Sequence, residues 1–447
     1  MKKYLSSIAA ILTVISLAGC SANNGNTNSE PSIGGTTAEG KYEGTDIGGR
    51  PSSGKSSDGI LGGLFGKSGE MDMATGGAIA EMATDTTASS SFAGPDGVDV
   101  IIDPTAPPSN PQPEPQAGML TGGEWNDNAH WSDWEALYSS HEEWNEYKKT
   151  WKSQIDNRIA VKVTSDGQPI AGAKVSCKNA ISSAVTDNKG MAYLFYTAIN
   201  GPTEQIVVDY KGNSKTIDGV IGSTSVECEL SGVSDSKQTA LDFMIMCDTT
   251  GSMGDELDYL KVELENIVRK VGAENANATI RTSVNFYRDE GDEYVVRQFP
   301  FTSDIEKSAG AIKEQSYDGG GDFPEAVHTA LDSAINKHEW DEDAVKIMFL
   351  VLDAPPHSED AQVVSSVNKH ICEAAEKGIR IVPIASSGID KSTEYLLRTM
   401  AFSTGGTYTF LTNDSGIGGS HIEPTVGAFN VEKLSDMMVR IVNDYLK

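Results

Sequence analysis

The sequence has little cysteine and little positive charge for its length. Its 447 residues include 5 cysteines, and 35 Lys and Arg stand against 64 Asp and Glu, giving a formal net charge of −29. Nucleic-acid binding depends on clustered basic side chains that displace counterions, so this balance argues against a DNA- or RNA-binding protein. The cysteines show no CxxC or Cys/His spacing, which excludes a disulfide scaffold and a structural zinc site. We therefore expect any bound metal to be held by oxygen ligands.

Sequence motifs of the common enzyme classes are also missing. The chain contains no Gly-x-Ser-x-Gly nucleophile elbow and no paired histidine metal motif, and residues 119–447 contain no Walker phosphate-binding loop. Serine and histidine are present, but not at spacings typical of a hydrolase. We predict that the protein is not an enzyme.

The N-terminus has the features of an export signal. Lys2 and Lys3 precede an apolar stretch from Ile8 to Leu17, which is too short to span a bilayer permanently. The run Leu17-Ala18-Gly19-Cys20 resembles a bacterial lipobox, which implies cleavage before Cys20 and attachment of lipid to its thiol. The alternative is an ordinary secretory signal that contains a cysteine. We predict a signal peptide over 1–20 and a lipoprotein of the cell envelope, extracytoplasmic and lipid-anchored to the membrane.

Two segments precede the regions with a domain-like pattern. Residues 21–118 are rich in Gly, Pro, Ser, Thr and Asn, and they predict a disordered linker that acts as a stalk. Residues 119–155 carry five of the six tryptophans, namely Trp125, Trp131, Trp134, Trp144 and Trp151. This segment predicts one or two amphipathic helices that pack on the next domain; the alternative is a set of exposed aromatic platforms that bind carbohydrate.

Residues 156–235 alternate apolar and polar side chains with a period of two, interrupted by Gly- and Asn-containing turns. This pattern predicts a small all-β sandwich. Gln168-Pro169-Ile170-Ala171-Gly172-Ala173 and Thr186-Asp187-Asn188-Lys189-Gly190 resemble sandwiches of the carboxypeptidase-regulatory or transthyretin-like type. We interpret Asp187 as a turn-forming residue. Cys177 and Cys228 lie in two different predicted strands, and their spacing leaves open whether they form a disulfide.

Residues 238–447 alternate strand and helix patterns, which predicts an α/β doubly wound, Rossmann-like fold. A strand pattern at 241–247 is followed by the polar turn Asp248-Thr249-Thr250-Gly251-Ser252 and a helix pattern from Leu257. Val345–Leu352 is continuously apolar, as expected for a strand buried on both faces of a parallel sheet. Helices are predicted over 322–336, 359–376 and 431–446. Pro383 interrupts the strand predicted at Ile379–Ala385, which favours an edge position or a bulge.

The residues at the strand ends of this region resemble the metal-ion-dependent adhesion site of the von Willebrand factor type A family. Asp248, Thr250 and Ser252 form an Asp-x-Thr-x-Ser motif, and Asp353 follows the later buried strand. The resemblance implies that the two hydroxyls ligate a divalent cation while the two carboxylates hold its bound waters. Hard oxygen ligands in an octahedral array favour Mg²⁺, with Mn²⁺ or Ca²⁺ as alternatives. A plain helix N-cap is the competing interpretation of the motif.

The sequence departs from the common family pattern at two ligand positions. Thr250 stands where serine is commoner, which keeps the hydroxyl. The family's second-loop threonine is harder to place, and Gly319-Gly320-Gly321-Asp322-Phe323-Pro324-Glu325 occupies that region, which is closer to the hemicentin-like branch. Asp322 is therefore either a further metal ligand or the N-cap of the next helix, with Glu325 completing a capping box. Asp289 is a possible accessory residue of the same crevice, and His357 is predicted to lie at its rim.

The resemblance implies a binding module that recognises an Asp or Glu carboxylate of a protein partner through its bound cation. We expect a monomer. The alternative functions are an exported enzyme or assembly factor that uses this domain for docking, and carbohydrate binding through the tryptophan segment.

Overall fold

The computed structural model describes residues 114–197, 203–220, 225–233 and 238–446. The predicted signal peptide, Cys20 and nearly all of the predicted linker lie outside the described residues. Within the described ranges, no helix is long and apolar enough to cross a membrane.

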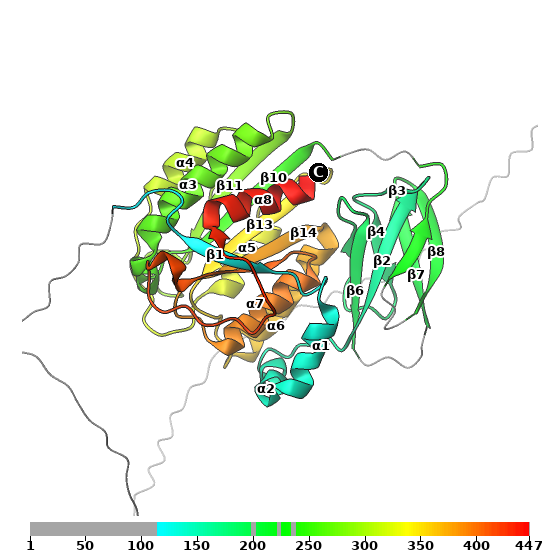
Figure 1. The fold of residues 1–447 in the computed structure, drawn as a ribbon, viewed down its shortest axis with the longest axis horizontal. Coiled ribbons are helices and arrows are strands. Elements are labelled where there is room, and N and C mark those ends of the chain that lie inside the picture. Colours follow the sequence, from blue (N-terminus) through cyan, green and yellow to red (C-terminus); the bar gives the residue numbers. More distant parts are fainter. Residues whose placement is uncertain (1–113, 198–202, 221–224, 234–237, 447) are drawn as a thin grey trace, which may run out of the picture. The chain divides into compact units, whose positions relative to one another are not determined.

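An eight-stranded mixed sheet forms the centre of the larger domain (Figure 1). Its central strands run parallel, and β12, β1 and β16 are antiparallel to their neighbours. In spatial order the strands are β12 (Val296–Arg297), β11 (Thr279–Tyr287), β10 (Ala240–Asp248), β13 (Val345–Leu352), β14 (Ile379–Ala385), β15 (Tyr408–Leu411), β1 (Thr121–Trp125) and β16 (Glu432–Lys433). The chain reverses its winding direction between β10 and β13, because β11 follows β10 on one side and β13 adds on the other.

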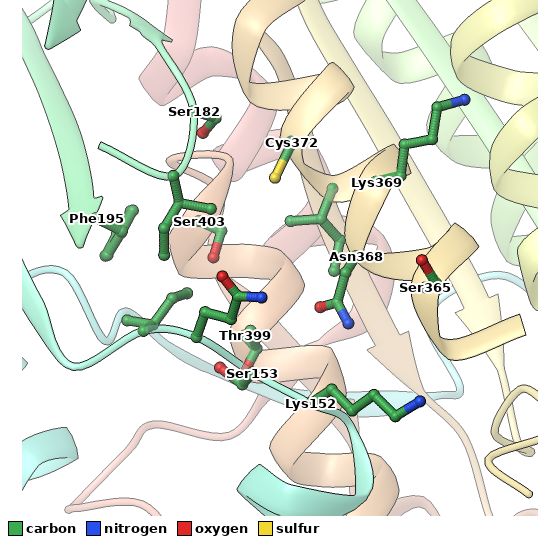
Figure 2. A pocket seen from close by; sticks show the side chains of 14 residues that line it. Lys152, Ser153, Ser182, Phe195, Ser365, Asn368, Lys369, Cys372, Thr399 and Ser403 are labelled. Atoms are coloured by element: carbon green, nitrogen blue, oxygen red, sulfur yellow. The ribbon is translucent and has the colours of Figure 1, made fainter. Parts of the chain in front are cut away.

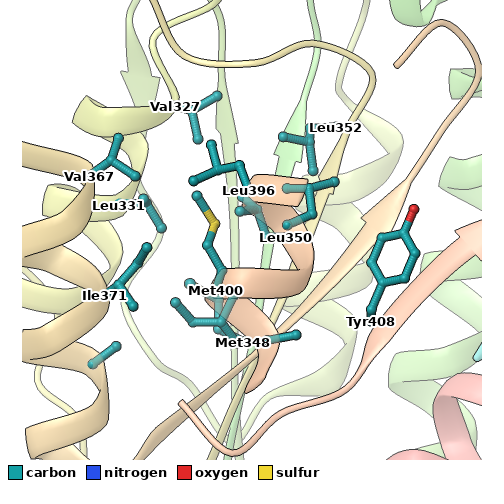
Figure 3. Close-up of a cluster of buried hydrophobic side chains, with 14 of the residues drawn as sticks. Val327, Leu331, Met348, Leu350, Leu352, Val367, Ile371, Leu396, Met400 and Tyr408 are labelled. Atoms are coloured by element: carbon teal, nitrogen blue, oxygen red, sulfur yellow. The ribbon is translucent and has the colours of Figure 1, made fainter. Parts of the chain in front are cut away.

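Helices cover both faces of this sheet. One face packs on α5 (Val327–Asn336), α6 (Ala361–Lys377) and α7 (Lys391–Ser403), as Figure 3 shows for side chains such as Met348, Leu350 and Met400. The other face packs on α3 (Leu257–Glu274), α4 (Ile305–Lys313) and α8 (Leu434–Leu446). Successive residues of β13 point to opposite faces, so Phe349 joins the second core while Leu350 joins the first. The doubly wound α/β prediction is confirmed.

Pro383 lies in an interior strand, so the prediction of an edge position or bulge is wrong. β14 pairs with β13 along its whole length and with β15 on its other side. The Pro383 carbonyl accepts a hydrogen bond from Thr409 Oγ1 on β15 at 2.7 Å. The proline nitrogen therefore also faces β15, where the ladder begins only at Ile384, and its missing N–H breaks no ladder hydrogen bond.

The middle of the chain forms two four-stranded sheets that share a separate apolar core. One sheet contains β3 (Gln168–Pro169), β2 (Asn157–Ser165), β6 (Met191–Tyr196) and β9 (Val226–Glu229), and the other contains β5 (Ala184–Val185), β4 (Lys174–Cys177), β7 (Thr203–Tyr210) and β8 (Asn213–Val220). Asp187 Oδ1 accepts hydrogen bonds from the backbone N–H groups of Lys189 and Met191, which gives it the turn-forming role. Cys177 and Cys228 are both free thiols.

The tryptophan segment packs on the α/β domain and also contacts the sandwich that follows it in sequence, where the Trp131 ring centroid lies 5.8 Å from that of Phe195. It begins with strand β1, drawn in cyan in Figure 1, which lies between β15 and the C-terminal strand β16. Helices α1 (Trp131–Ser140) and α2 (Glu142–Thr150) follow, and Trp134 and Trp144 are buried against Tyr395 of α7. Burial of these indoles removes them as exposed platforms for carbohydrate.

Candidate metal centre

Four loops meet at the carboxyl edge of the sheet, where the winding direction reverses between β10 and β13. In doubly wound sheets this crevice is the usual ligand position. Asp248 is the last residue of β10, and Asp353 comes directly after β13. Since Cys247 pairs with Val351 in the parallel ladder, the two aspartates emerge from adjacent strands. The sequence prediction that they share one edge is thus consistent with the sheet register.

The Asp-x-Thr-x-Ser turn is organised by the first aspartate. Asp248 Oδ1 accepts hydrogen bonds from the Thr250 backbone N–H at 2.9 Å and from its hydroxyl at 2.7 Å. The hydroxyls of Thr250 and Ser252 lie 3.2 Å apart, and Ser252 is exposed to solvent. Thr250 occupies the N-cap position of the 3₁₀ helix η1 (Gly251–Asp255), but its side chain makes no capping hydrogen bond, and the N-cap of the following helix α3 is Glu256. The competing N-cap interpretation of the motif is therefore wrong.

Several buried carboxylate oxygens around this turn have no hydrogen-bond partner among the described residues. They are Asp248 Oδ2, Asp353 Oδ1 and Glu325 Oε2. Tyr287 ends β11 and is paired in register with Asp248, and its hydroxyl interacts with the Asp248 carboxylate. Buried polar atoms of native proteins are nearly always paired, so a group of orphaned oxygens indicates that something else interacts with them.

Glu325, not Asp322, is the carboxylate that the glycine-rich loop turns into the centre. Glu325 is buried, and a Cβ atom on Gly320 would lie 3.0 Å from its Oε1 and 3.5 Å from Thr250 Cβ. Gly320 has φ +75°, and the loop also joins the motif through a hydrogen bond from Gly251 N–H to the Gly319 carbonyl at 3.2 Å. Only a residue without a side chain allows this close approach.

Asp322 itself is exposed, and it does not cap the following helix. Helix α5 begins at Val327, its N-cap is Ala326, and no side chain caps it. The helix begins only after Glu325 because the backbone of Glu325 is extended. Its N–H donates a hydrogen bond to the Pro355 carbonyl at 2.8 Å, and Glu325 forms a β-bridge with Pro356. The helix-cap alternative for Asp322 is therefore wrong.

Asp289 and His357 lie beside these residues. Asp289 is buried and accepts a hydrogen bond from His357 Nε2 at 3.2 Å, and the His357 Nδ1 atom lies 2.8 Å from Glu359. Burial lowers the pKa of His357, but the hydrogen bonds to Glu359 and Asp289 outweigh it, so the pKa is raised overall. This supports the prediction of a rim position for His357.

The carboxylates of the centre are held in a protein environment that favours their protonated forms. Burial raises the pKa of Asp353, and the charge of Asp248 adds to the shift. Burial also raises the pKa of Asp248, although the hydrogen bonds from Thr250 oppose it. The pKa of Glu325 rises to about 9, through burial and then through the charges of Asp248, Asp289 and Asp353. A nearby cation would reverse these shifts.

The donor set suits a hard divalent cation. Carboxylate and hydroxyl oxygens are the ligands that Mg²⁺ prefers, and these are the side-chain groups of Asp248, Thr250, Ser252 and Asp353. No group of three or more His, Cys, Asp or Glu side chains is placed to hold a metal ion within the described ranges. A cation at this edge would therefore need the hydroxyls of Thr250 and Ser252 as well as the carboxylates.

A separate cavity of about 280 Å³ lies away from this centre, between the tryptophan segment, the sandwich and helices α6 and α7 (Figure 2). Its lining includes Lys152, Phe195, Asn368, Cys372 and Ser403. None of the residues of the candidate metal centre lines it, so the two features are independent.

One family model and two known proteins match parts of this chain. Residues 240–423 match the von Willebrand factor A domain family, so this part of the chain is a von Willebrand factor A domain, as the resemblance implied. An ariadne-like RING finger protein of Acanthamoeba polyphaga mimivirus is 33% identical over 123 residues, which are 27% of this chain and only 12% of that protein. The conserved hypothetical protein BatB from Bacteroides thetaiotaomicron aligns with 12% identity and a TM-score of 0.32, over 46% of this chain and 98% of that structure.

The sequence analysis missed the role of Glu325. It assigned Glu325 only as the partner of a capping box and placed the candidate ligand at Asp322. The available signal was Pro324, which biases the preceding Phe323 away from the helical conformation and so disfavours a helix that begins at Asp322. That signal does not by itself specify which of the two carboxylates points inward.

Proposed function

We propose that the von Willebrand factor A domain is a binding module that holds a divalent cation at the β10–β13 edge and uses it to bind a carboxylate of a protein partner. The observation that carries this proposal is the group of buried, unpaired oxygens on Asp248, Asp353 and Glu325. Buried carboxylates are costly unless they are paired or coordinate a metal. Mg²⁺ would supply the missing positive charge, with Mn²⁺ or Ca²⁺ as alternatives.

The hydroxyl and carboxylate side chains around the turn would have different roles in holding the cation. The hydroxyls of Thr250 and Ser252 would ligate it directly, and Asp248 and Asp353 would balance its charge from the sheet. Glu325 is the further carboxylate, and Asp322 is exposed enough to contribute from the loop. The cation acts as a Lewis acid that leaves room for an external carboxylate. Binding rather than turnover is thus the proposed activity.

Calorimetric titration of Mg²⁺ into the EDTA-treated protein tests the metal site. We expect saturable heat with the wild type and none with Ser252→Ala or Asp353→Ala. Asp322→Ala and Glu325→Ala decide between the two candidate loop carboxylates, because loss of the heat identifies the ligand. Asp304→Ala is a matched control, since Asp304 is an aspartate that only caps helix α4. Absence of metal-dependent heat in the wild type would overturn the proposal.

We further propose that the chain is a membrane-anchored lipoprotein of the cell envelope that acts as a monomer. The proposal rests on the lipobox-like run ending at Cys20, which lies outside the described residues. Cys20→Ala should release the protein from the membrane fraction or leave a precursor without lipid. Membrane retention with an unchanged mass of the mature protein would refute it.

A further inference from the structure

Two exposed aromatic side chains flank the glycine-rich loop of the candidate metal centre. The large apolar side chains that are exposed among the described residues are Val220, Tyr317, Phe323 and Val431, each with 45 to 50% of its surface accessible, and only Tyr317 and Phe323 of these border that loop. Tyr317 and Phe323 stand on either side of residues 318–322, the loop whose Gly320 touches Thr250 and Glu325. Isolated exposed apolar residues need no explanation, but two aromatic rings on one functional loop do.

The Tyr317 ring is held against the metal-binding turn. A Cβ atom on Gly254 would lie 2.8 Å from Tyr317 Cε2, so the ring lies directly on the backbone two residues after Ser252. The loop and the turn are also joined by the hydrogen bond from the Asp318 N–H to the Thr249 carbonyl at 3.2 Å. The ring is therefore positioned in advance, and a partner that covers it loses little conformational freedom at this site.

Phe323 is placed on the other side of the same loop. It is 46% exposed, although the next residues, Pro324 and Glu325, turn back into the structure and Glu325 is buried. The extended pairing of Glu325 with Pro356 fixes the backbone directly after Phe323. About half of the Phe323 surface is left in water, and contact with an apolar group of a partner would bury it favourably.

We propose that Tyr317 and Phe323 form an apolar rim that receives a large aliphatic or aromatic side chain next to the partner's acidic residue. The inference rests on the proposed function, because the bound cation takes the carboxylate. A carboxylate alone distinguishes few partners, whereas aromatic anchors commonly carry the energy of an interface. The apolar rim would therefore select partners in which the acidic residue has an apolar neighbour.

The charges around the rim restrict the partner further. Asp318 and Asp322 are both exposed on the loop between the two rings. A partner with several adjacent acidic residues would bring like charges together there, which is unfavourable. The favoured partner surface presents one Asp or Glu flanked by apolar side chains and free of a second acid.

Selection from a displayed library of nine-residue peptides with a fixed central Asp tests the rim. In millimolar Mg²⁺, the wild-type protein should enrich Leu, Ile, Phe or Trp next to the Asp by on the order of tenfold over Ser and Thr. The double variant Tyr317→Ser/Phe323→Ser should lose this enrichment while it still requires the Asp. Val431→Ser is the matched control, since it removes an equally exposed apolar side chain beside β16, at the far end of the sheet from β12 and β11.

The outcomes separate the rim from the metal site. Calorimetry should show that the double variant still binds Mg²⁺, so a lost preference is not a lost cation. Asp-dependent selection without any apolar preference, or a preference that survives in the double variant, would overturn the rim and leave the proposed function standing. Failure to select Asp peptides over their Asn counterparts in Mg²⁺ would overturn both.

Discussion

Two groups of buried acidic side chains in the α/β domain differ in how their charge is balanced. In the first, which we call the Arg398 cluster, Arg398 donates to Asp127 Oδ1 at 2.6 Å and Oδ2 at 3.0 Å, and it lies 3.5 Å from Glu394. Lys391 and the Thr425 N–H also bind Glu394. The carboxylates of the Arg398 cluster are therefore paired with basic side chains of the same chain.

The carboxylates of the candidate metal centre are comparably buried. Among the described residues, however, no basic side chain is bound to Asp248, Glu325 or Asp353, and each of these three residues has an unpaired oxygen atom. The Arg398 cluster fastens Asp127 of the tryptophan segment to α7, and Arg398 also lies 5.0 Å from the Trp134 ring centroid. The comparison teaches that burial of acid alone does not distinguish the two groups. They differ in whether the chain itself supplies the counter-ion, and this difference is the basis of the proposed metal site.

Breaking the Arg398 cluster should have the largest effect on stability. Arg398→Met removes the cation and leaves Asp127 and Glu394 buried without it, which we expect to lower the free energy of unfolding by about 3–5 kcal/mol. Urea denaturation followed by tryptophan fluorescence measures the change. Arg269→Met is the control, because its ion pairs with Glu265 and Glu306 are on the surface, and it should have a much smaller effect. A loss equal to that of the control would contradict the account.

In the candidate metal centre, acid should stabilise the metal-free protein rather than destabilise it. The pKa values of Asp248, Asp353 and Glu325 are raised in the folded state, and that of Glu325 lies near 9. The folded state therefore holds more protons than the unfolded state between about pH 4.5 and 9, so the contribution of these groups is complete below that window and is lost as the pH rises.

The measurement is the free energy of unfolding in EDTA across that window. We expect a decrease on the order of a few kcal/mol from pH 5 to pH 9. Glu325→Gln should flatten most of the slope, whereas Glu359→Gln, an exposed neighbour, should not. A stability that increases with pH in the wild type would show that these carboxylates are paired after all.

A smaller effect is expected from the glycine loop. Gly320→Ala introduces a side chain at φ +75° and 3.0 Å from Glu325 Oε1, which should cost about 1–2 kcal/mol and weaken Mg²⁺ binding. Gly212→Ala is matched in backbone conformation, with φ +82°, but has open space around it. Denaturation and Mg²⁺ calorimetry should show a similar backbone cost in both variants and weaker metal binding only in Gly320→Ala. Equal metal binding in both would contradict the placement of Gly320.

The sequence predicted those features of the centre that depend on local pattern. Asp248, Thr250 and Ser252 are contiguous, and Asp353 follows an apolar strand whose end is readable, so strand register alone brings them together. Glu325 was not predictable in its role, because its direction depends on pairing with Pro356 in another loop.

The same distinction applies to the rest of the fold. The alternation of strands and helices could be predicted from the periodicity of apolar residues. The position of β1 could not, because β1 adds antiparallel to a sheet whose other strands lie more than 100 residues away in sequence. The partner of the tryptophan segment was equally unpredictable, because α7 is separated from it by the entire sandwich. Such contacts are set by surface complementarity, which periodicity does not encode.

The measurement that tests the central claim most directly is the melting temperature with and without Mg²⁺ for the wild type and Ser252→Ala. A cation that binds only the folded state adds about 2.7 kcal/mol at a hundredfold excess over its dissociation constant. The account predicts that Mg²⁺ raises the melting temperature of the wild type and does not change that of Ser252→Ala. In Arg398→Met, Mg²⁺ should still raise the melting temperature, although this variant melts at a lower temperature without Mg²⁺. Wild-type melting that is unchanged by Mg²⁺, Mn²⁺ and Ca²⁺ alike would contradict the claim that the centre lacks only its cation.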